Sequence, residues 1–456
     1  MRRPAPATAA EAVAALVAAP YAEELGVLIA DSRVGRRRKH PAWLPVTYAA
    51  LARHFRSANH LDAEMASGLW ATLRREAIAR SLPDPGGDPY TYAQHAYWRE
   101  RAIDDEVLDD MLSAFTRLSL EHARSTGLLL ESGGGSVTHP HPTRTIYGDG
   151  TIVRPIFGQR TIEAPDDEPE GGEDEDDEEV VARQDESAAT HHRHDGPIYG
   201  NNFVIVSARG QAPGSRVVLG IDRVEAPGKE AMTSVALMER IVAEAGPGIQ
   251  AAVYDGAFVG THIDRLMRST GLVVINRQRA ASRTEDEVVP KRRALGIFEH
   301  QAGEKTCSHS LHTENGQVVD MGLADDGSAV VVASAVRRQV KRFGRKDGTY
   351  RFTMAVEIPC RHGAFTVWLS PHATAPGDTT PEHVRLIPPA DPDFNLLYGL
   401  RNDAESFNSA FKRSLLVDRA ASVGWRRQLF DLLGFVVLQN SLNWLASCDS
   451  SMEESA

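Results

Sequence analysis

Hydrophobic side chains recur every three or four positions through the first 125 residues, a spacing that predicts amphipathic helices. The pattern is clearest over 47–56, 61–82 and 104–125, and the second segment stops before Pro83. We therefore predict a helical N-terminal domain over residues 1–130. Residues 47–77 fit a helix-turn-helix, but no glycine marks the turn, so a plain helical bundle fits equally well.

From residue 142 the pattern changes to the alternation typical of strands. The expected strands are 143–157, 203–210, 215–224, 249–258 and 272–278, and the expected helices between the later strands are 229–246 and 261–271. Three strands followed by strand–helix–strand crossovers predict an α/β fold with a mixed sheet and helices on its faces. This order, over residues 142–279, resembles a ribonuclease-H-like core.

Residues 280–390 contain short strand-like pieces separated by glycine-rich turns, which predicts a β-rich insertion. Helical spacing then returns over 391–416 and 423–447, and Asp391 can cap the first of these helices. We expect the helices of residues 391–447 to complete the core that residues 142–279 begin.

The formal charge of −12 comes from one segment. Residues 166–186 hold 13 of the 62 acidic residues and one of the 50 basic residues, so the rest of the chain is balanced. Low hydrophobicity and high charge density predict a disordered loop over about residues 164–197, and disorder also explains the histidines of 190–195 better than a metal site does. Basic clusters at 36–39, 291–293 and 337–346 are compatible with phosphate contacts, although solvated surfaces give this pattern more often.

The composition favours a reducing compartment. No run of about 18 apolar residues is present, so we predict a cytoplasmic protein that does not enter a membrane. Three cysteines, Cys307, Cys360 and Cys448, cannot form a disulfide framework.

Three acidic residues stand at positions where a sheet of this kind carries its chemistry. Asp149 lies in the first strand between two glycines, Asp255 ends the fourth strand, and Glu405 lies on the helix after the insertion. Carboxylates brought together in this way repel and require a hard divalent cation, and a pair of Mg²⁺ ions suits in-line attack on a phosphodiester. Individually, an aspartate before glycine is more often a turn residue, and Glu405 is an ordinary surface glutamate.

The segment around Glu405 carries the most specific motif. Tyr398, Arg401, Glu405 and Lys412 are separated by two, three and six residues. On a single helix these four side chains share one face, which by itself fits a solvated, salt-bridged surface. The same identities and spacings resemble the Tyr-Arg-Glu-Lys signature of one branch of DDE transposases of bacterial insertion sequences, over roughly residues 143–279 and 391–445.

That resemblance implies a function and a set of roles. Asp149, Asp255 and Glu405 would bind Mg²⁺ or Mn²⁺ as the catalytic triad, with Asp222 as the substitute for Asp149. Arg401 and Lys412 would hold phosphates, and Tyr398 would position the DNA end. The partners would be double-stranded DNA at element ends and targets, with the helical domain recognising ends. A DNA-bound homodimer at the bacterial nucleoid is implied.

Two alternatives remain open at this level. One is a ribonuclease-H-like nuclease without strand transfer. The other is a domesticated, transposase-like protein that binds DNA without cutting it, which the acidic segment favours because a polyanion competes with DNA for a basic surface.

The insertion carries a second set of ligand-type residues. Cys307, His309, Cys360 and His362 offer two thiolates and two imidazoles, which is a set that structural zinc accepts, with His312 as an alternative to His309. The spacing is tighter than in common zinc knuckles, and cysteines in strands are often plain core residues.

Overall fold

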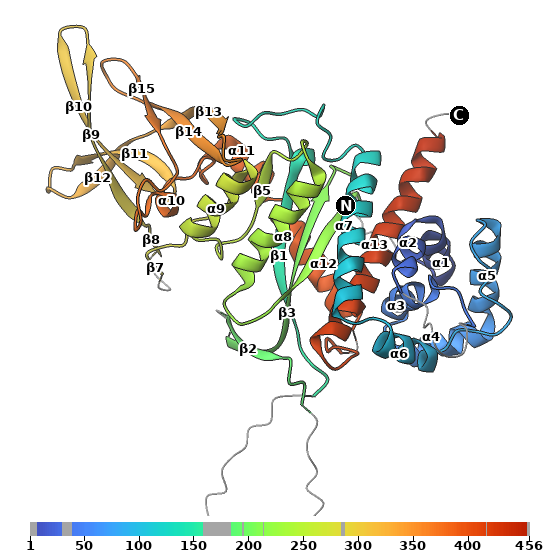
Figure 1. The fold of residues 1–456 in the computed structure, drawn as a ribbon. Helices are drawn as coiled ribbons and strands as arrows, with labels where there is room; N and C mark the ends of the chain where they lie inside the picture. The colour runs from blue at the N-terminus through green and yellow to red at the C-terminus, as the bar shows by residue number, and fades with distance from the viewer. Residues whose placement is uncertain are drawn as a thin grey trace, which may run out of the picture.

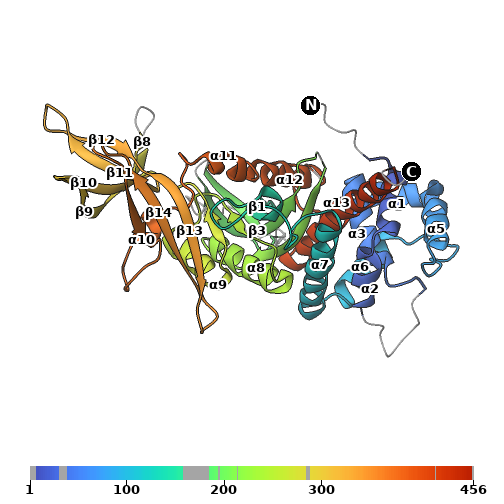
Figure 2. The same ribbon diagram turned by 90° about the horizontal axis from the view of Figure 1, so that it is seen from above.

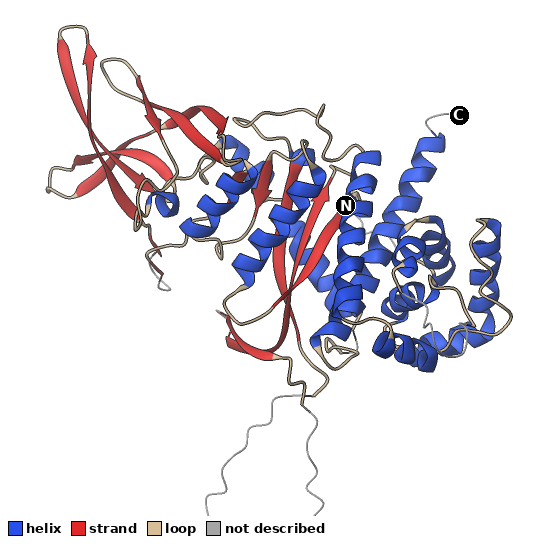
Figure 3. Cartoon of the chain, in the orientation of Figure 1, coloured by secondary structure: helices blue, strands red, loops and turns tan. Residues whose placement is uncertain are grey.

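A sheet with parallel and antiparallel strands lies at the centre of the molecule (Figures 1 and 3). The computed structural model describes residues 7–29, 39–157, 184–193, 196–212, 214–283, 288–415 and 417–453. The sheet lies between the N-terminal helices at one end and a β-rich arm at the other (Figure 2).

Five strands form the main body of the sheet. In order across the sheet they are β4 (Arg216–Val224), β3 (Gly196–Arg209), β1 (Thr145–Val153), β5 (Ala251–Val253) and β6 (Val273–Ile275). Strands β4, β3 and β1 are antiparallel neighbours, whereas β1, β5 and β6 run parallel. Parallel neighbours need crossovers, which α8 (Glu230–Ala245) and α9 (Gly260–Thr270) supply. The prediction of a mixed α/β sheet with helices is confirmed.

A sixth strand corrects the prediction of disorder near the histidines. Residues Ala189–Arg193 form β2, which pairs antiparallel with residues 196–200 of β3. Strand β3 is longer than its partner β1, which pairs only with residues 201–207, so the remainder of β3 offers free backbone groups to another strand. Residues 164–183 of the predicted acidic loop lie outside the described residues.

Alternate residues of β3 enter two different hydrophobic cores. Phe203 and Ile205 pack in a core with the N-terminal and C-terminal helices, whereas Val204 and Val206 pack in a core with α8, α9 and the insertion. This alternation follows from the two-residue period of a strand and explains why the strand sequence is apolar on both faces.

The N-terminal part is helical, as predicted. Its helices are α1 (Ala9–Ala18), α2 (Tyr21–Val27), α3 (Leu44–Phe55), α4 (Ala58–Glu64), α5 (Trp70–Ala79), α6 (Tyr92–Arg101) and α7 (Asp105–Ser125). The expectation of one helix over 61–82 is wrong. Gly68 has a φ of 146°, which a regular helix does not accommodate. The chain therefore kinks within Met65–Leu69, and this kink separates α4 from α5.

The last helix, α13 (Trp425–Glu453), belongs to the same core as these N-terminal helices. It is the one helix of the described residues with the length and apolar character to cross a membrane, and 67% of the most apolar 18-residue window within Trp425–Cys448 is buried inside the protein. Asn440 donates to the backbone carbonyl of Val218 (2.9 Å) and accepts from its amide (2.9 Å), which fixes the helix against β4.

The insertion is β-rich, as predicted. One four-stranded sheet consists of β9 (Arg292–Ala302), β10 (Lys305–Glu314), β11 (Gln317–Leu323) and β12 (Ala329–Ser334). A three-stranded sheet consists of β13 (Val336–Gly344), β14 (Tyr350–Ile358) and β15 (Phe365–Leu369), and β7 (Ser282–Arg283) pairs with β8 (Val288–Val289). The short helix α10 (Thr380–His383) follows.

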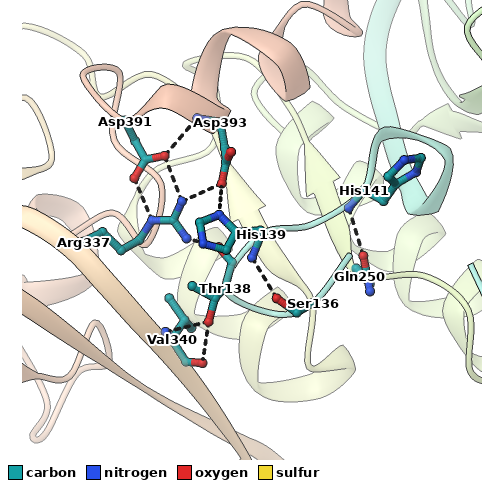
Figure 4. Close-up of polar contacts among 9 residues, drawn as sticks. All are labelled: Ser136, Thr138, His139, His141, Gln250, Arg337, Val340, Asp391 and Asp393. Atoms are coloured by element: carbon teal, nitrogen blue, oxygen red, sulfur yellow. Dashed lines mark hydrogen bonds and ion pairs between the residues drawn. The ribbon is translucent and has the colours of Figure 1, made fainter. Parts of the chain in front are cut away.

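A buried arginine attaches the insertion to the next helix, α11 (Pro392–Tyr398) (Figure 4). Arg337 of β13 donates from Nε to Asp391 Oδ2 (2.6 Å) and from Nη2 to Asp391 Oδ1 (2.8 Å) and Asp393 Oδ2 (2.7 Å). Asp391 caps α11, and its Oδ1 also accepts the amide of Asp393 (3.0 Å). Arg337 also donates to the carbonyl of Thr138, so this side chain joins three segments distant in sequence.

The expected single helix over 391–416 is two helices. Residues Gly399 and Leu400 form a turn between α11 and α12 (Arg401–Arg413). The amide of Leu400 bonds to the carbonyl of Leu397 (3.1 Å), three residues back, so the chain tightens here. Tyr398 therefore ends one helix, and Arg401 begins the next.

Candidate active site

Asp149 lies within β1, and Asp255 lies two residues beyond the end of the neighbouring parallel strand, β5. Tyr147 of β1 pairs with Val253 of β5, two residues before each aspartate. Neighbouring strands are about 4.8 Å apart. The negative charge of Asp255 acts on Asp149, so the two carboxylates are close in space. The Oδ1 atom of Asp255 also accepts the amide of Ala257 (2.8 Å), as a turn residue does.

The helix that carries Glu405 is fixed on the sheet by Asp403. The carboxylate of Asp403 accepts hydrogen bonds from the Tyr147 hydroxyl and from Arg209 Nη1 (2.9 Å). Arg216 Nη1 lies 3.2 Å from Asp403 Oδ2 and donates to the Asp403 carbonyl (3.0 Å). Side chains from β1, β3 and β4 thus all contact the largely buried carboxylate of Asp403. These contacts fix the position of α12 along the three strands.

Asn408 brings α12 into direct contact with Asp149. Its Nδ2 atom donates to Asp149 Oδ2 (3.0 Å) and to the carbonyl of Gly150 (3.2 Å). Residues three apart on a helix share a face, so Glu405 lies one turn before Asn408 on the side of the aspartates. The Glu405 carboxylate is 54% exposed and pairs with Arg401 Nη1 at 2.6 Å, which is the pair that a salt-bridged helix face predicts.

The charges of these residues act on one another. Burial raises the pKa of Asp149 to about 7, against the opposing charge of Arg401 and with a further increase from Asp255 and Glu230. Burial acts to lower the pKa of Arg401, but the negative charges of Asp149, Glu405 and Asp255 outweigh it and raise the value. Arg401 thus interacts electrostatically with three carboxyl groups, those of Asp149, Asp255 and Glu405. The cluster contains more acidic than basic side chains.

Tyr398 lies beside this group. Its ring stacks on Phe394 with centroids 4.9 Å apart, and the guanidinium of Arg277 lies 5.0 Å from its centroid. Burial raises the pKa of Tyr398, and the charges of Arg401 and Arg277 oppose the increase.

Lys412 lies seven residues after Glu405, about 10 Å along the helix axis, on the same half of the helix surface.

Asp222 is not part of the group. It lies in β4, which pairs with β3 and is separated from β5 by two strands. Its carboxylate is 2.7 Å from Arg240 Nη2. The geometry therefore favours Asp149 over Asp222 as the partner of Asp255.

Sequence reasoning missed four residues of this site. Asp403 and Asn408 lie on either side of Glu405 within the motif. Arg277 follows β6, and its place at the carboxyl end of a parallel strand is a signal that could have identified it. Glu230 gives no signal in the sequence. It lies on α8 beneath the opposite face, where a side chain on Gly150 would meet its carboxylate at 2.2 Å, and it accepts from Asn202 Nδ2 (2.8 Å).

The donor set suits a hard divalent cation. Asp149 on β1, Asp255 just after β5 and Glu405 on α12 offer oxygen ligands. The pKa of Asp149 is raised mainly by burial, with smaller contributions from Asp255 and Glu230. The same group has two cationic neighbours, Arg277 and Arg401.

A second group of metal-ligating type lies in the insertion. One ligand atom from each of His300, His309 and Cys360 lies within 4.8 Å of the others. Two of the ligands expected from sequence, Cys307 and His362, are not in this group of three. The Nε2 atom of His362 accepts from Arg361 Nε (3.1 Å). Its place is taken by His300, which sequence reasoning missed because the residue lies on the preceding strand, β9.

Comparison with known protein families, with curated proteins and with solved structures finds no match to this chain. The function is therefore argued from the residues of the site.

Proposed function

We propose that this chain is a DDE transposase of the branch with the Tyr-Arg-Glu-Lys signature, which cuts and joins DNA at the ends of a transposable element. The observation that carries the proposal is the proximity of Asp149, in β1, to Asp255, just beyond the parallel strand β5, together with the contact of Asp149 with Asn408 on α12, the helix that bears Glu405. The strand order supports a ribonuclease-H-like core, because three antiparallel strands are followed by two parallel strands added through helical crossovers.

In this proposal Asp149, Asp255 and Glu405 hold a pair of Mg²⁺ or Mn²⁺ ions. When bound, such ions lower the pKa of an attacking water and stabilise the leaving 3′ oxygen. Asn408 orients Asp149 by donating to its Oδ2 atom. Glu405, which pairs with Arg401, would turn to hold a cation, and Arg401 would then be available for a phosphate oxygen.

The DNA would lie across α12 and the carboxyl ends of the parallel strands. Arg401 and Arg277 flank the carboxylates, and Tyr398 offers a half-buried ring beside the reacting end. Lys412, about 10 Å further along α12, would contact a phosphate away from the scissile bond. Two element ends cut together would require two chains, so we propose a DNA-bound homodimer acting at the nucleoid.

The test is cleavage of a labelled duplex that carries the DNA flanking the gene, including any terminal inverted repeats. We expect wild type to produce 3′-OH ends with Mg²⁺ and none with EDTA, and to join them to a target plasmid. Glu405→Gln should be at least about 100-fold slower, because a lost metal ligand removes several kcal/mol of transition-state stabilisation. Glu304→Gln, an exposed glutamate in the β9–β10 turn, is the matched control and should cleave like wild type.

Each outcome distinguishes the candidates. Equal cleavage by wild type and Glu405→Gln contradicts the catalytic assignment. Cleavage without joining favours a nuclease. Retained DNA binding without cleavage in any variant favours a domesticated DNA-binding protein.

Mg²⁺ binding should depend on pH through Asp149. Because the pKa of Asp149 is about 7, Mg²⁺ must displace a proton at lower pH, and the Mg²⁺ dissociation constant should rise about tenfold per unit below pH 7. Glu230→Gln removes a charge that raises this pKa, so the weakening should begin at a lower pH. Isothermal titration calorimetry between about pH 5.5 and pH 8, on both sides of the Asp149 pKa of about 7, measures the Mg²⁺ dissociation constant of wild type and of Glu230→Gln. Superimposable curves for the two proteins would contradict a role for Glu230.

A further inference from the structure

Three side chains that can bind a metal, His300, His309 and Cys360, converge between the two sheets of the insertion, and Cys307 lies beside them. His300 on β9 is the cross-strand partner of Cys307 on β10, and His309 lies two positions after Cys307, so all three share one face of the β9–β10 ribbon. Cys360 approaches this face from the loop that follows β14. This loop belongs to the other sheet, so the group joins two separate parts of the insertion (Figure 1).

The two histidines each direct one unpartnered nitrogen into the group. His309 is 7% exposed, and its Nε2 is buried without a hydrogen-bond partner, as is Nδ1 of His300. A buried polar atom without a partner is unfavourable, so two such atoms close to each other and to a thiol indicate a missing common partner. A cation accepts the lone pairs of both nitrogens at once.

The opposite nitrogen of each ring is already held. Nδ1 of His309 lies 2.6 Å from the buried Asp320 Oδ2, and Nε2 of His300 lies 3.1 Å from the carbonyl of Gly363. A metal-bound histidine characteristically donates its other N–H to a carboxylate or a backbone carbonyl, which fixes the tautomer that presents the free lone pair. Both supporting contacts of a metal site are therefore in place.

The fourth position falls to Cys307. Its thiol lies within hydrogen-bonding reach of the Cys360 thiol, and neither cysteine is in a disulfide. Phe365 closes one side of the group, with its ring 4.3 Å from that of His300 and 4.8 Å from that of His309. Two thiolates and two imidazoles around a small, partly apolar space match the tetrahedral ligand set of structural zinc.

We propose that His300, Cys307, His309 and Cys360 bind one structural Zn²⁺ ion, which holds the β9–β10 ribbon against the loop between β14 and β15. The assignment is independent of the proposed function. It replaces His362 of the sequence-based set with His300. The ion crosslinks residues about 60 positions apart in the chain, and the ribbon that it anchors carries few other buried side chains.

Metal content of the full chain, purified under reducing conditions without an affinity tag, tests the proposal. Elemental analysis should find about one zinc per wild-type chain, and Co²⁺ added to metal-free protein should give the visible absorption of a tetrahedral thiolate site. His309→Ala and Cys360→Ser should each lose most of this zinc. His362→Ala and Cys448→Ser are the matched controls and should retain it, because neither side chain belongs to the group.

A second readout does not depend on how the variants fold. Chelation of zinc from wild type should accelerate tryptic cleavage after Lys305, in the ribbon, with no change at sites in the N-terminal helices. Less than about 0.1 zinc per wild-type chain after reconstitution, or equal zinc in His309→Ala and wild type, overturns the proposal. A Cys307–Cys360 disulfide in protein kept under reducing conditions also overturns it.

Discussion

Asp149→Asn is expected to make the metal-free protein more stable at pH 8 and, in the same protein, to reduce Mg²⁺-dependent DNA cleavage to background. The pKa of Asp149 is about 7 in the folded protein, mainly because of burial, and about 3.9 in an unfolded chain. At a pH between these two pKa values, Asp149 is protonated in the folded protein and ionised in the unfolded chain. The free energy of unfolding therefore falls as pH rises from about 4 to 7, and above pH 7 the penalty is fully present.

Asparagine removes this penalty and can still accept the hydrogen bond from Asn408. The three-unit difference corresponds to about 4 kcal/mol, so we expect a gain of about 1–4 kcal/mol at pH 8 and almost none at pH 4, measured by urea unfolding in EDTA. Mg²⁺ should stabilise wild type, whose carboxylate binds it, and leave Asp149→Asn unchanged. A variant less stable than wild type at pH 8 would show that Asp149 is an ordinary structural acid.

Arg337→Met should cause the largest loss of stability. The Arg337 side chain is 4% exposed and pairs with the 6%-exposed carboxylate of Asp391, so the substitution leaves buried negative charge without a partner (Figure 4). Removing one member of a buried ion pair typically costs about 3–5 kcal/mol of unfolding free energy. Urea unfolding followed by circular dichroism measures the change. Because Asp391 caps α11, which ends in Tyr398, cleavage should weaken as well.

The adjacent residue provides the control. Arg338 pairs with Glu357, but its side chain is 55% exposed, so Arg338→Met should change the free energy of unfolding by no more than about 1 kcal/mol. Adding Asp391→Asn to Arg337→Met should restore part of the loss, since the unpaired charge is then removed. Equal effects of Arg337→Met and Arg338→Met would mean that the buried cluster does not stabilise the attachment of the insertion.

Sequence periodicity predicted the elements of the central sheet, because residues that alternate between two cores leave a recognisable pattern. It also selected Asp149, Asp255 and Glu405, which the fold brings close to Arg401. It did not find Asp403 or Asn408, whose roles depend on what lies beneath α12. Strand β2 was missed because its pairing depends on the extra length of β3 and not on its own hydrophobicity.

The insertion illustrates a second limit. Cys307, His309 and Cys360 stood out as ligand types, but His300 is separated from them by a strand pairing that no local spacing reveals. Gly68 shows the reverse case: its φ of 146° interrupts a helix within a stretch whose helical periodicity continues on both sides. The periodicity of hydrophobic residues indicates which face of a helix or strand is buried. Which residues distant in sequence contact one another depends on how the elements pack, and periodicity does not show this.

The sharing of one core by the N-terminal helices and α13 has a consequence for synthesis of the chain. Ala49 of α3 lies against the backbone of Gly434 in α13, where a β-carbon would approach within 2.7 Å. At about 5–20 residues per second, a ribosome needs roughly 20–80 s to travel between these helices. During that interval the first helices lack the surface that buries them. A nascent or prematurely terminated chain without α13 is therefore incompletely folded, so the N-terminal helices complete their core only after the ribosome has passed Gly434.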